Sequence, residues 1–222
     1  MHRRKKFILI PAILTLLTLA FLSAALAADV KFANDMDTHW SKGYVWYLQE
    51  QGLVKGYPDG TFRPDQLVTR AEFTHMFMNV FKNQYTKTNR IMTPTNPAGS
   101  IQKFSDAANI PDWAKNSVEE AVKFGIINGT PDGGFNPDDG ITRAEAMTIV
   151  GRTMLAEYDM NELNYFIDEI PVWAQDSVAK VKSAGLIEAK KDGLFKPDEL
   201  ITRGELAKIF LIYYCGEDII DN

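Results

Sequence analysis

An arginine at the start of a predicted helix recurs three times in this 222-residue chain. The three residues are Arg70, Arg143 and Arg203. A cation in the first turn opposes the positive end of the helix dipole, so each arginine is locally unfavourable. A guanidinium beside the free N–H groups of a helix N-terminus would suit a carboxylate or a phosphate. These residues therefore predict recognition of an anion, and the alternative is an ion pair with an Asp or Glu of a neighbouring unit.

Each arginine lies inside a Thr-x-x-Glu pattern that precedes an apolar run. The pairs are Thr69/Glu72, Thr142/Glu145 and Thr202/Glu205. This spacing is typical of a capping box, in which the threonine hydroxyl caps the helix and the glutamate reaches back to the N-cap N–H. We interpret these glutamates as structural and not catalytic.

Tryptophans and Asp-Gly pairs recur at fixed distances before the arginines. The tryptophans are Trp40, Trp113 and Trp173, and the pairs are Asp59-Gly60, Asp132-Gly133 and Asp192-Gly193. An exposed indole beside an arginine would suit a sugar with an acidic group, and core packing is the alternative. The Asp-Gly pairs lack the alternating Asp/Asn ligands and bidentate glutamate of an EF-hand calcium loop, so we interpret them as turns.

Three copies of one helix-loop-helix unit account for this recurrence. Each copy has an apolar stripe that ends at a glycine, a turn segment, and a second apolar stripe. In the first copy the second stripe is Phe73, Met76, Phe77 and Val80, at the i, i+3, i+4, i+7 spacing of a buried helix face. Two short helices cannot bury such faces alone. We therefore expect an all-α fold in which three repeats pack as a pseudo-trimer around a shared core, with binding sites in the grooves between them.

The predicted organisation is a signal peptide at 1–27, repeats at 30–81, 104–155 and 166–215, and linkers at 82–103 and 156–165. Residues 3–6 are basic, residues 7–22 are mainly apolar, and Ala25-Leu26-Ala27 has the small-x-small pattern of a cleavage site. A retained membrane anchor is the alternative. After cleavage we expect a secreted chain without a membrane span.

The composition argues against several functional classes. The formal net charge is -5, and the only charged residues of the first 27 are four basic ones, so the remainder is more acidic still. An acidic chain is a poor candidate for binding nucleic acid or an anionic membrane surface. Three histidines and one cysteine are too few and too scattered for a zinc site. No Ser-His-Asp set or Gly-rich phosphate loop occurs at useful spacing, so we expect no cofactor, no metal and no enzymatic activity.

The repeated pattern resembles the S-layer homology domain, three copies of which would cover about residues 32–214. Residues 141–145, Ile-Thr-Arg-Ala-Glu, match the best-known motif of that family fully, and residues 68–72 match it nearly so. The third copy departs at Gly204 and at Ala189, where the other copies have Gly56 and Gly129. The resemblance implies a central three-helix bundle formed by one helix from each repeat. It also implies noncovalent binding of bacterial cell-wall polysaccharide, often a secondary wall polymer that ends in a pyruvylated amino sugar.

The resemblance also implies ligand roles for the tryptophan, the loop Asp and Gly, and the motif arginine. The candidate ligand-binding residues are Trp40, Gly56, Asp59, Arg70, Trp113, Gly129, Asp132, Arg143, Trp173, Asp192 and Arg203. The expected partners are a secondary cell-wall polymer or a peptidoglycan-linked polysaccharide, with S-layer or other envelope proteins as further partners. The expected location is the cell wall or S-layer. An extracellular protein-interaction scaffold, or an S-layer accessory protein that binds a partner, is the alternative.

The third repeat is expected to contribute least to binding. Gly56 and Gly129 suit a left-handed backbone or close approach of a ligand, whereas Ala189 suits neither. Lys190 and Lys191 also replace the Tyr-Pro and Thr-Pro pairs of the other two loops, which removes a constraint and adds two mobile cations. Of the three motif arginines, Arg203 should therefore matter least for ligand binding.

Overall fold

The predicted all-α fold class is confirmed over the residues that the computed structural model describes, which are 33–88, 93–155, 157–216 and 219–220. Within these residues the α-helices are α2 (Lys42–Glu50), α3 (Arg70–Lys87), α4 (Asp112–Lys123), α5 (Arg143–Arg152), α6 (Val172–Ser183) and α7 (Arg203–Cys215). Short 3-10 helices lie at Ile101–Lys103, Ala107–Asn109 and Met160–Tyr165. The predicted signal peptide lies outside the described residues, and none of the described helices is long and apolar enough to cross a membrane.

The helix ends form where the sequence predicts them. In all three Thr-x-x-Glu boxes the threonine hydroxyl accepts the glutamate N–H, and the glutamate carboxylate accepts the threonine N–H. The glycines after α2, α4 and α6 have φ between +67° and +72°, the left-handed conformation in which a helix commonly stops. The second helix of the first repeat is longer than expected, because α3 continues through Lys87 into the predicted linker.

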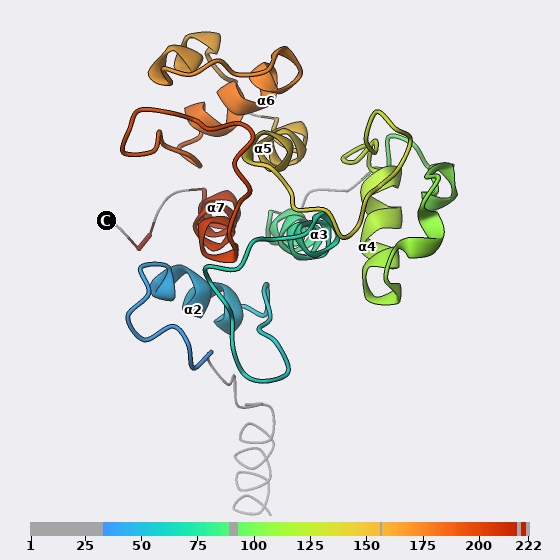
Figure 1. The fold of residues 1–222 in the computed structure, drawn as a ribbon, viewed down its shortest axis with the longest axis horizontal. Helices are drawn as coiled ribbons and strands as arrows, with labels where there is room; N and C mark the ends of the chain where they lie inside the picture. Colours follow the sequence, from blue (N-terminus) through green and yellow to red (C-terminus); the bar gives the residue numbers. More distant parts are fainter. Residues whose placement is uncertain (1–32, 89–92, 156, 217–218, 221–222) are drawn as a thin grey trace, which may run out of the picture. The chain divides into compact units, whose positions relative to one another are not determined.

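Each first helix packs mainly on the second helix of a different repeat. Helix α4 of the second repeat packs on α3 of the first, α6 of the third on α5 of the second, and α2 of the first on α7 of the third. Figure 1 shows α3, α5 and α7 nearly end-on, with α2, α4 and α6 outside them. The apolar face of each repeat is therefore covered by another repeat.

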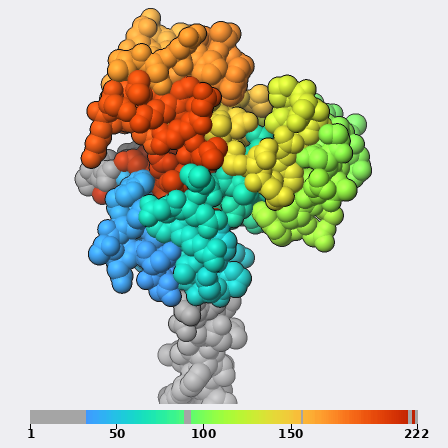
Figure 2. Space-filling model, viewed as in Figure 1, coloured from blue at the N-terminus to red at the C-terminus, as the bar shows by residue number. Residues whose placement is uncertain are grey.

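The loops that lead into α3, α5 and α7 are joined in a closed ring of backbone hydrogen bonds. The Val68 N–H donates to the Ile201 carbonyl at 3.1 Å, and the Ile201 N–H donates to the Ile141 carbonyl at 3.2 Å. The Ile141 N–H completes the ring by donating to the Val68 carbonyl at 3.0 Å. All three side chains are buried, and segments of the three repeats meet in the middle of the face in Figure 2.

Contacts among the second helices are uneven. Phe73 and Phe77 of α3 lie against Phe210 of α7, with ring centroids 5.9 and 5.8 Å apart. At the equivalent positions α5 carries the smaller Ala146 and Val150. The residue after α5, Thr153, is joined to α7 by a 2.9 Å hydrogen bond between its hydroxyl and that of Tyr213. The pseudo-trimer around a central three-helix bundle stays a prediction.

Candidate functional site

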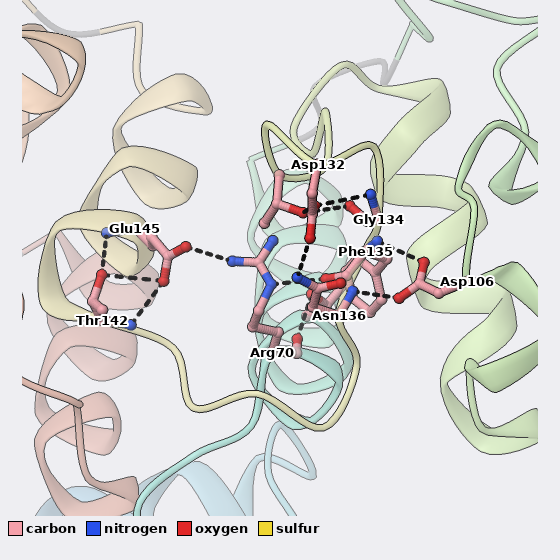
Figure 3. Close-up of polar contacts among 10 residues, drawn as sticks. Arg70, Asp106, Asp132, Gly134, Phe135, Asn136, Thr142 and Glu145 are labelled. Carbon is pink, nitrogen blue, oxygen red and sulfur yellow. Dashed lines mark hydrogen bonds and ion pairs between the residues drawn. The ribbon is translucent and has the colours of Figure 1, made fainter.

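A carboxylate that the sequence analysis missed holds the loop of each repeat. Asp35, Asp106 and Asp168 each accept two consecutive backbone N–H groups, at 2.6 to 2.8 Å. The second donor of each pair has a left-handed φ of 55° to 58°, although none is glycine; these residues are Arg63, Asn136 and Lys196. Such a conformation is unfavourable for a side-chain-bearing residue, so the carboxylate stabilises a strained loop. Figure 3 shows this contact for Asp106.

The predicted turn role of the Asp-Gly pairs fits the hydrogen bonds of their aspartates. The Asp59 carboxylate accepts the Thr61 hydroxyl at 2.6 Å, and the Asp132 carboxylate accepts the Gly134 N–H at 3.2 Å. Asp192 accepts the Leu194 N–H at 3.2 Å. Each aspartate also accepts a hydrogen bond from the side chain of the residue four positions later in the sequence. All these hydrogen bonds stabilise the ionised form, so the pKa of each of the three carboxyls lies below its ordinary value. None of the three lines the grooves described below, and their role as ligands stays a prediction.

Each motif arginine reaches across to the loop of another repeat. The Arg70 Nε donates to the Phe135 carbonyl at 2.8 Å, as Figure 3 shows. Arg143 makes the same bond to Phe195 at 2.9 Å, and Arg203 makes it to Phe62 at 2.7 Å. The three arginine residues are only 4% to 7% exposed. Because the Nε is bound to backbone, only the terminal N–H groups of the guanidinium remain for a ligand.

The helix N-termini do not offer the free N–H groups that the sequence analysis expected, because these groups are already bound. At the start of α3 the Arg70 N–H donates to the Asp139 carbonyl and the next N–H donates to the Pro137 carbonyl. The third N–H donates to the capping threonine, Thr69. The same bonds occur in α5 and α7, with carbonyls of residues 199 and 197 and of residues 66 and 64. An anion at these sites must therefore be bound by the guanidinium.

Three grooves lie between the repeats, and each is lined by residues of all three. The lining of groove 1 includes Gly56, Tyr57, Glu72, His75, Asn79, Trp113 and Arg203. That of groove 2 includes Arg70, Gly129, Thr130, Glu145, Thr148, Arg152 and Trp173. That of groove 3 includes Trp40, Arg143, Lys190, Glu205 and Lys208. Their volumes are about 870, 410 and 230 Å³.

The composition of the grooves places the loop of each repeat with the arginine of a different repeat. Each groove combines the arginine of one repeat, the loop and capping glutamate of the next, and the tryptophan of the one after. Arg203 therefore lies with the loop of Gly56, and the loop of Ala189 lies with Arg143. The expectation that Arg203 matters least depended on the wrong pairing.

The two loop glycines meet different requirements. Gly129 has the predicted positive φ, of 90°. Gly56 does not have one, but a Cβ there would lie 2.5 Å from the Thr61 carbonyl oxygen. Of the two alternatives that the sequence offered, Gly129 meets the left-handed backbone, whereas at Gly56 close approach of the chain to itself requires glycine.

Groove 1 contains a buried arginine without a carboxylate partner. Among the described residues no carboxylate lies within ion-pair distance of Arg203, whose Nη2 donates to the Lys55 carbonyl at 3.2 Å. The neighbouring Glu72 instead accepts the Tyr57 hydroxyl at 2.8 Å. Burial lowers the pKa of Arg203, and burial with nearby lysines also lowers the pKa of His75, so that imidazole is neutral at neutral pH.

Grooves 2 and 3 differ in how the positive charge of the motif arginine is compensated. In groove 2 the Arg70 Nη1 forms a 2.8 Å ion pair with Glu145, which is the alternative that the sequence left open. In groove 3 Lys190 pairs with Glu205, and among the described residues no carboxylate is within ion-pair distance of Arg143. Burial alone would raise the pKa of Glu205, but Lys190 and the Thr202 N–H hold it below its ordinary value. Lys190 is therefore a fixed cation and not the mobile one expected.

Comparison with known proteins agrees with the repeat geometry. The family model of the S-layer homology domain matches residues 34–74, 103–147 and 167–207, which together make up more than half of the chain. The chain belongs to the S-layer homology domain family. Every match includes one motif arginine and its capping box.

Several known proteins are similar to this chain over most of its length. Exoglucanase XynX of Acetivibrio thermocellus is 34% identical over 194 residues, which cover 84% of this chain and 16% of the relative. The cellulosome-anchoring protein of Acetivibrio thermocellus is 32% identical over 163 residues, 71% of this chain and 34% of the relative. S-layer protein EA1 of Bacillus anthracis is 27% identical over 193 residues, 86% of this chain and 21% of the relative. This chain thus spans about a third or less of the length of these relatives.

Proposed function

We propose that this chain attaches noncovalently to the cell envelope by binding an acidic cell-wall polysaccharide in the grooves between its repeats. The carrying observation is that Arg143 and Arg203 are at least 95% buried without a carboxylate in ion-pair distance among the described residues. Burying a charge is unfavourable unless a partner compensates it. A carboxylate on a sugar, such as a pyruvyl group, would supply that partner through the free terminal N–H groups.

The tryptophans supply the second half of a sugar site. Trp40, Trp113 and Trp173 are 52% to 58% exposed, and one lines each groove. An exposed indole offers an apolar face on which a sugar ring packs and an N–H that donates to a hydroxyl. The names of relatives, which include cellulosome-anchoring, S-layer and cell surface proteins, support a place at the cell surface. The proposed partner is a secondary cell-wall polymer or peptidoglycan-linked polysaccharide, and no catalysis is proposed.

The grooves should not contribute equally. Groove 1 is the largest and its arginine, Arg203, is uncompensated, so it should bind most strongly. In groove 3 the narrower space and the Lys190–Glu205 pair limit access to Arg143. This order reverses the one expected from the sequence.

Substitution of the exposed tryptophans tests the proposal with little risk to the fold. Trp113→Ala should weaken binding to purified cell walls about tenfold, and the Trp40, Trp113 and Trp173 triple variant should abolish it. Trp46→Ala is the matched control, because Trp46 is 43% exposed and outside the lining of the three grooves. Binding should also disappear when the nonpeptidoglycan polymer is removed from the walls. Full binding by the triple variant would exclude the grooves, and full binding to stripped walls would favour a protein partner.

A further inference from the structure

Groove 2 contains a second arginine that is not part of the repeated motif. Arg152 is the last residue of α5, and its Nη1 donates to the Ile126 carbonyl at 3.0 Å, which orients the guanidinium. Among the described residues no carboxylate lies within ion-pair distance of Arg152. The motif arginine of the same groove, Arg70, is already neutralised by Glu145. Arg152 is solvent-exposed, and it is the arginine of groove 2 that has no carboxylate partner among the described residues.

A buried hydroxyl of the same groove has no partner. Thr148 is 4% exposed and lines groove 2, one helical turn before Arg152. In the part of the chain that the structure describes, its Oγ1 is the only buried side-chain nitrogen or oxygen without a hydrogen-bond partner. Buried polar atoms are normally satisfied, and an unsatisfied one costs roughly 1–3 kcal/mol. Because the hydroxyl oxygen is covered in this rotamer, a rotation about χ1 that turns it into the groove would let a polar atom of a ligand satisfy it.

The positions equivalent to Thr148 and Arg152 in the other two repeats do not combine an unpartnered hydroxyl with an arginine. In groove 1 they are His75 and Asn79, and the Asn79 amide is already bound to the Leu53 carbonyl at 2.5 Å. In the third repeat they are Lys208 and Ile212, and isoleucine cannot bind an anion. The pair of a cation and an unpartnered hydroxyl is therefore specific to the second repeat.

We propose that Arg152 and Thr148 form the carboxylate-binding subsite of groove 2, with Arg152 in the role that Arg143 and Arg203 have in the other grooves. The proposal rests on the proposed function, because the ligand is an acidic sugar of the same wall polymer. Arg152 binds the carboxylate with its remaining N–H groups, and the Thr148 hydroxyl donates to an oxygen of the same sugar. Trp173 lies in the lining of the same groove and provides the apolar face.

The test isolates groove 2 in the full chain. In the Trp40→Ala/Trp113→Ala background, titration calorimetry measures the affinity for polymer released from purified cell walls. Arg152→Gln should lower this affinity about tenfold, and Thr148→Val should lower it about fivefold. Lys123→Gln is the matched control for charge, since Lys123 pairs with Glu119 outside the lining of groove 2, and it should leave the affinity unchanged.

The Tm distinguishes a binding role of Thr148 from a structural one. Thr148→Val removes an unsatisfied hydroxyl, so its Tm should equal or exceed that of the parent while its affinity falls. Thr74→Val is the matched control, because the buried Thr74 hydroxyl donates to the Arg70 carbonyl at 2.8 Å, and its loss should lower the Tm.

The outcomes separate the two proposals. If the wild-type chain does not bind the polymer, the proposed function fails and this inference fails with it. If the wild type binds and the background variant does not, groove 2 is not a site and only the inference fails. Unchanged affinity of Arg152→Gln in a binding background would also overturn it.

Discussion

The motif arginines combine a structural contact and a binding surface in one side chain. The Arg203 Nε holds the Phe62 carbonyl, while the cation lies 4.5 Å above the Phe62 ring and 4.8 Å above the Tyr57 ring. Aromatic faces compensate part of the desolvation of a guanidinium, but an aromatic ring is no substitute for a carboxylate. Removal of such an arginine therefore affects both the fold and the ligand.

Arg203→Ala should reduce the free energy of unfolding by roughly 1–3 kcal/mol, because the Phe62 carbonyl loses its buried partner. Wall polymer should raise the Tm of the wild-type chain, since a ligand that binds only the native state stabilises it. The same polymer should raise the Tm of Arg203→Ala much less. Thermal melts with and without polymer measure both effects, and Arg63→Ala, at an exposed ion pair with Asp59, is the control. If the polymer raised the Tm of Arg203→Ala as much as that of the wild-type chain, a ligand role for Arg203 would be contradicted.

The loop aspartates should make stability depend on acid pH. The Thr130 hydroxyl, the Gly134 N–H and the Asn136 amide lower the folded-state pKa of Asp132. The carboxylate therefore stabilises the fold fully above its unfolded-state pKa, about 3.9, and this stabilisation is lost as the pH falls through the lower folded-state pKa. Asp132→Asn should lower the Tm at pH 7, and the difference from wild type should shrink by pH 2. Asp138→Asn, at an exposed position of the same loop, is the control for the loss of one surface charge.

At the scale of the elements, the sequence indicated where helices begin and end, but not which helices pack on one another. Thr142 with Glu145 predicted a capping box, and the box forms. A 3.6-residue apolar period shows that a helix face is buried, but not by which helix. It therefore could not predict that each first helix packs on the second helix of another repeat. Asp35, Asp106 and Asp168 were missed because they precede their tryptophans by five, seven and five residues, which hides them from a search at fixed spacing.

The capping boxes should contribute measurably to stability. Thr142→Ala removes the side-chain cap of α5 and should reduce the free energy of unfolding by about 1 kcal/mol. Thr142→Ser keeps the hydroxyl and should lose much less. Urea unfolding followed by circular dichroism measures both variants. Equal losses would show that the threonine methyl group, and not the cap, matters at this position.

For the whole molecule, the packing of each first helix on the second helix of another repeat predicts that the three repeats unfold as one cooperative unit. A chain that ends at Lys103 keeps α2 and α3 but lacks α7, on which α2 packs, and α4, which packs on α3. It also lacks the carbonyls of Asp139 and Pro137 that bind the first N–H groups of α3. We expect this chain to be largely unfolded by circular dichroism. A cooperative calorimetric transition of the monomer would contradict the prediction.

The ring of backbone bonds among Val68, Ile141 and Ile201 also bears on how such a protein can evolve. An open solenoid gains or loses a repeat cheaply, because each repeat contacts only its neighbours. In a closed ring, insertion of a fourth copy has to open a bond between two existing copies, and deletion of one leaves two edges unpaired. The geometry therefore fixes the copy number at three and the cyclic order of the repeats, but not which repeat comes first in the chain. A gene rearranged to begin at residue 104 would encode the same pairings, so circular permutation is the more accessible route to new arrangements of this chain.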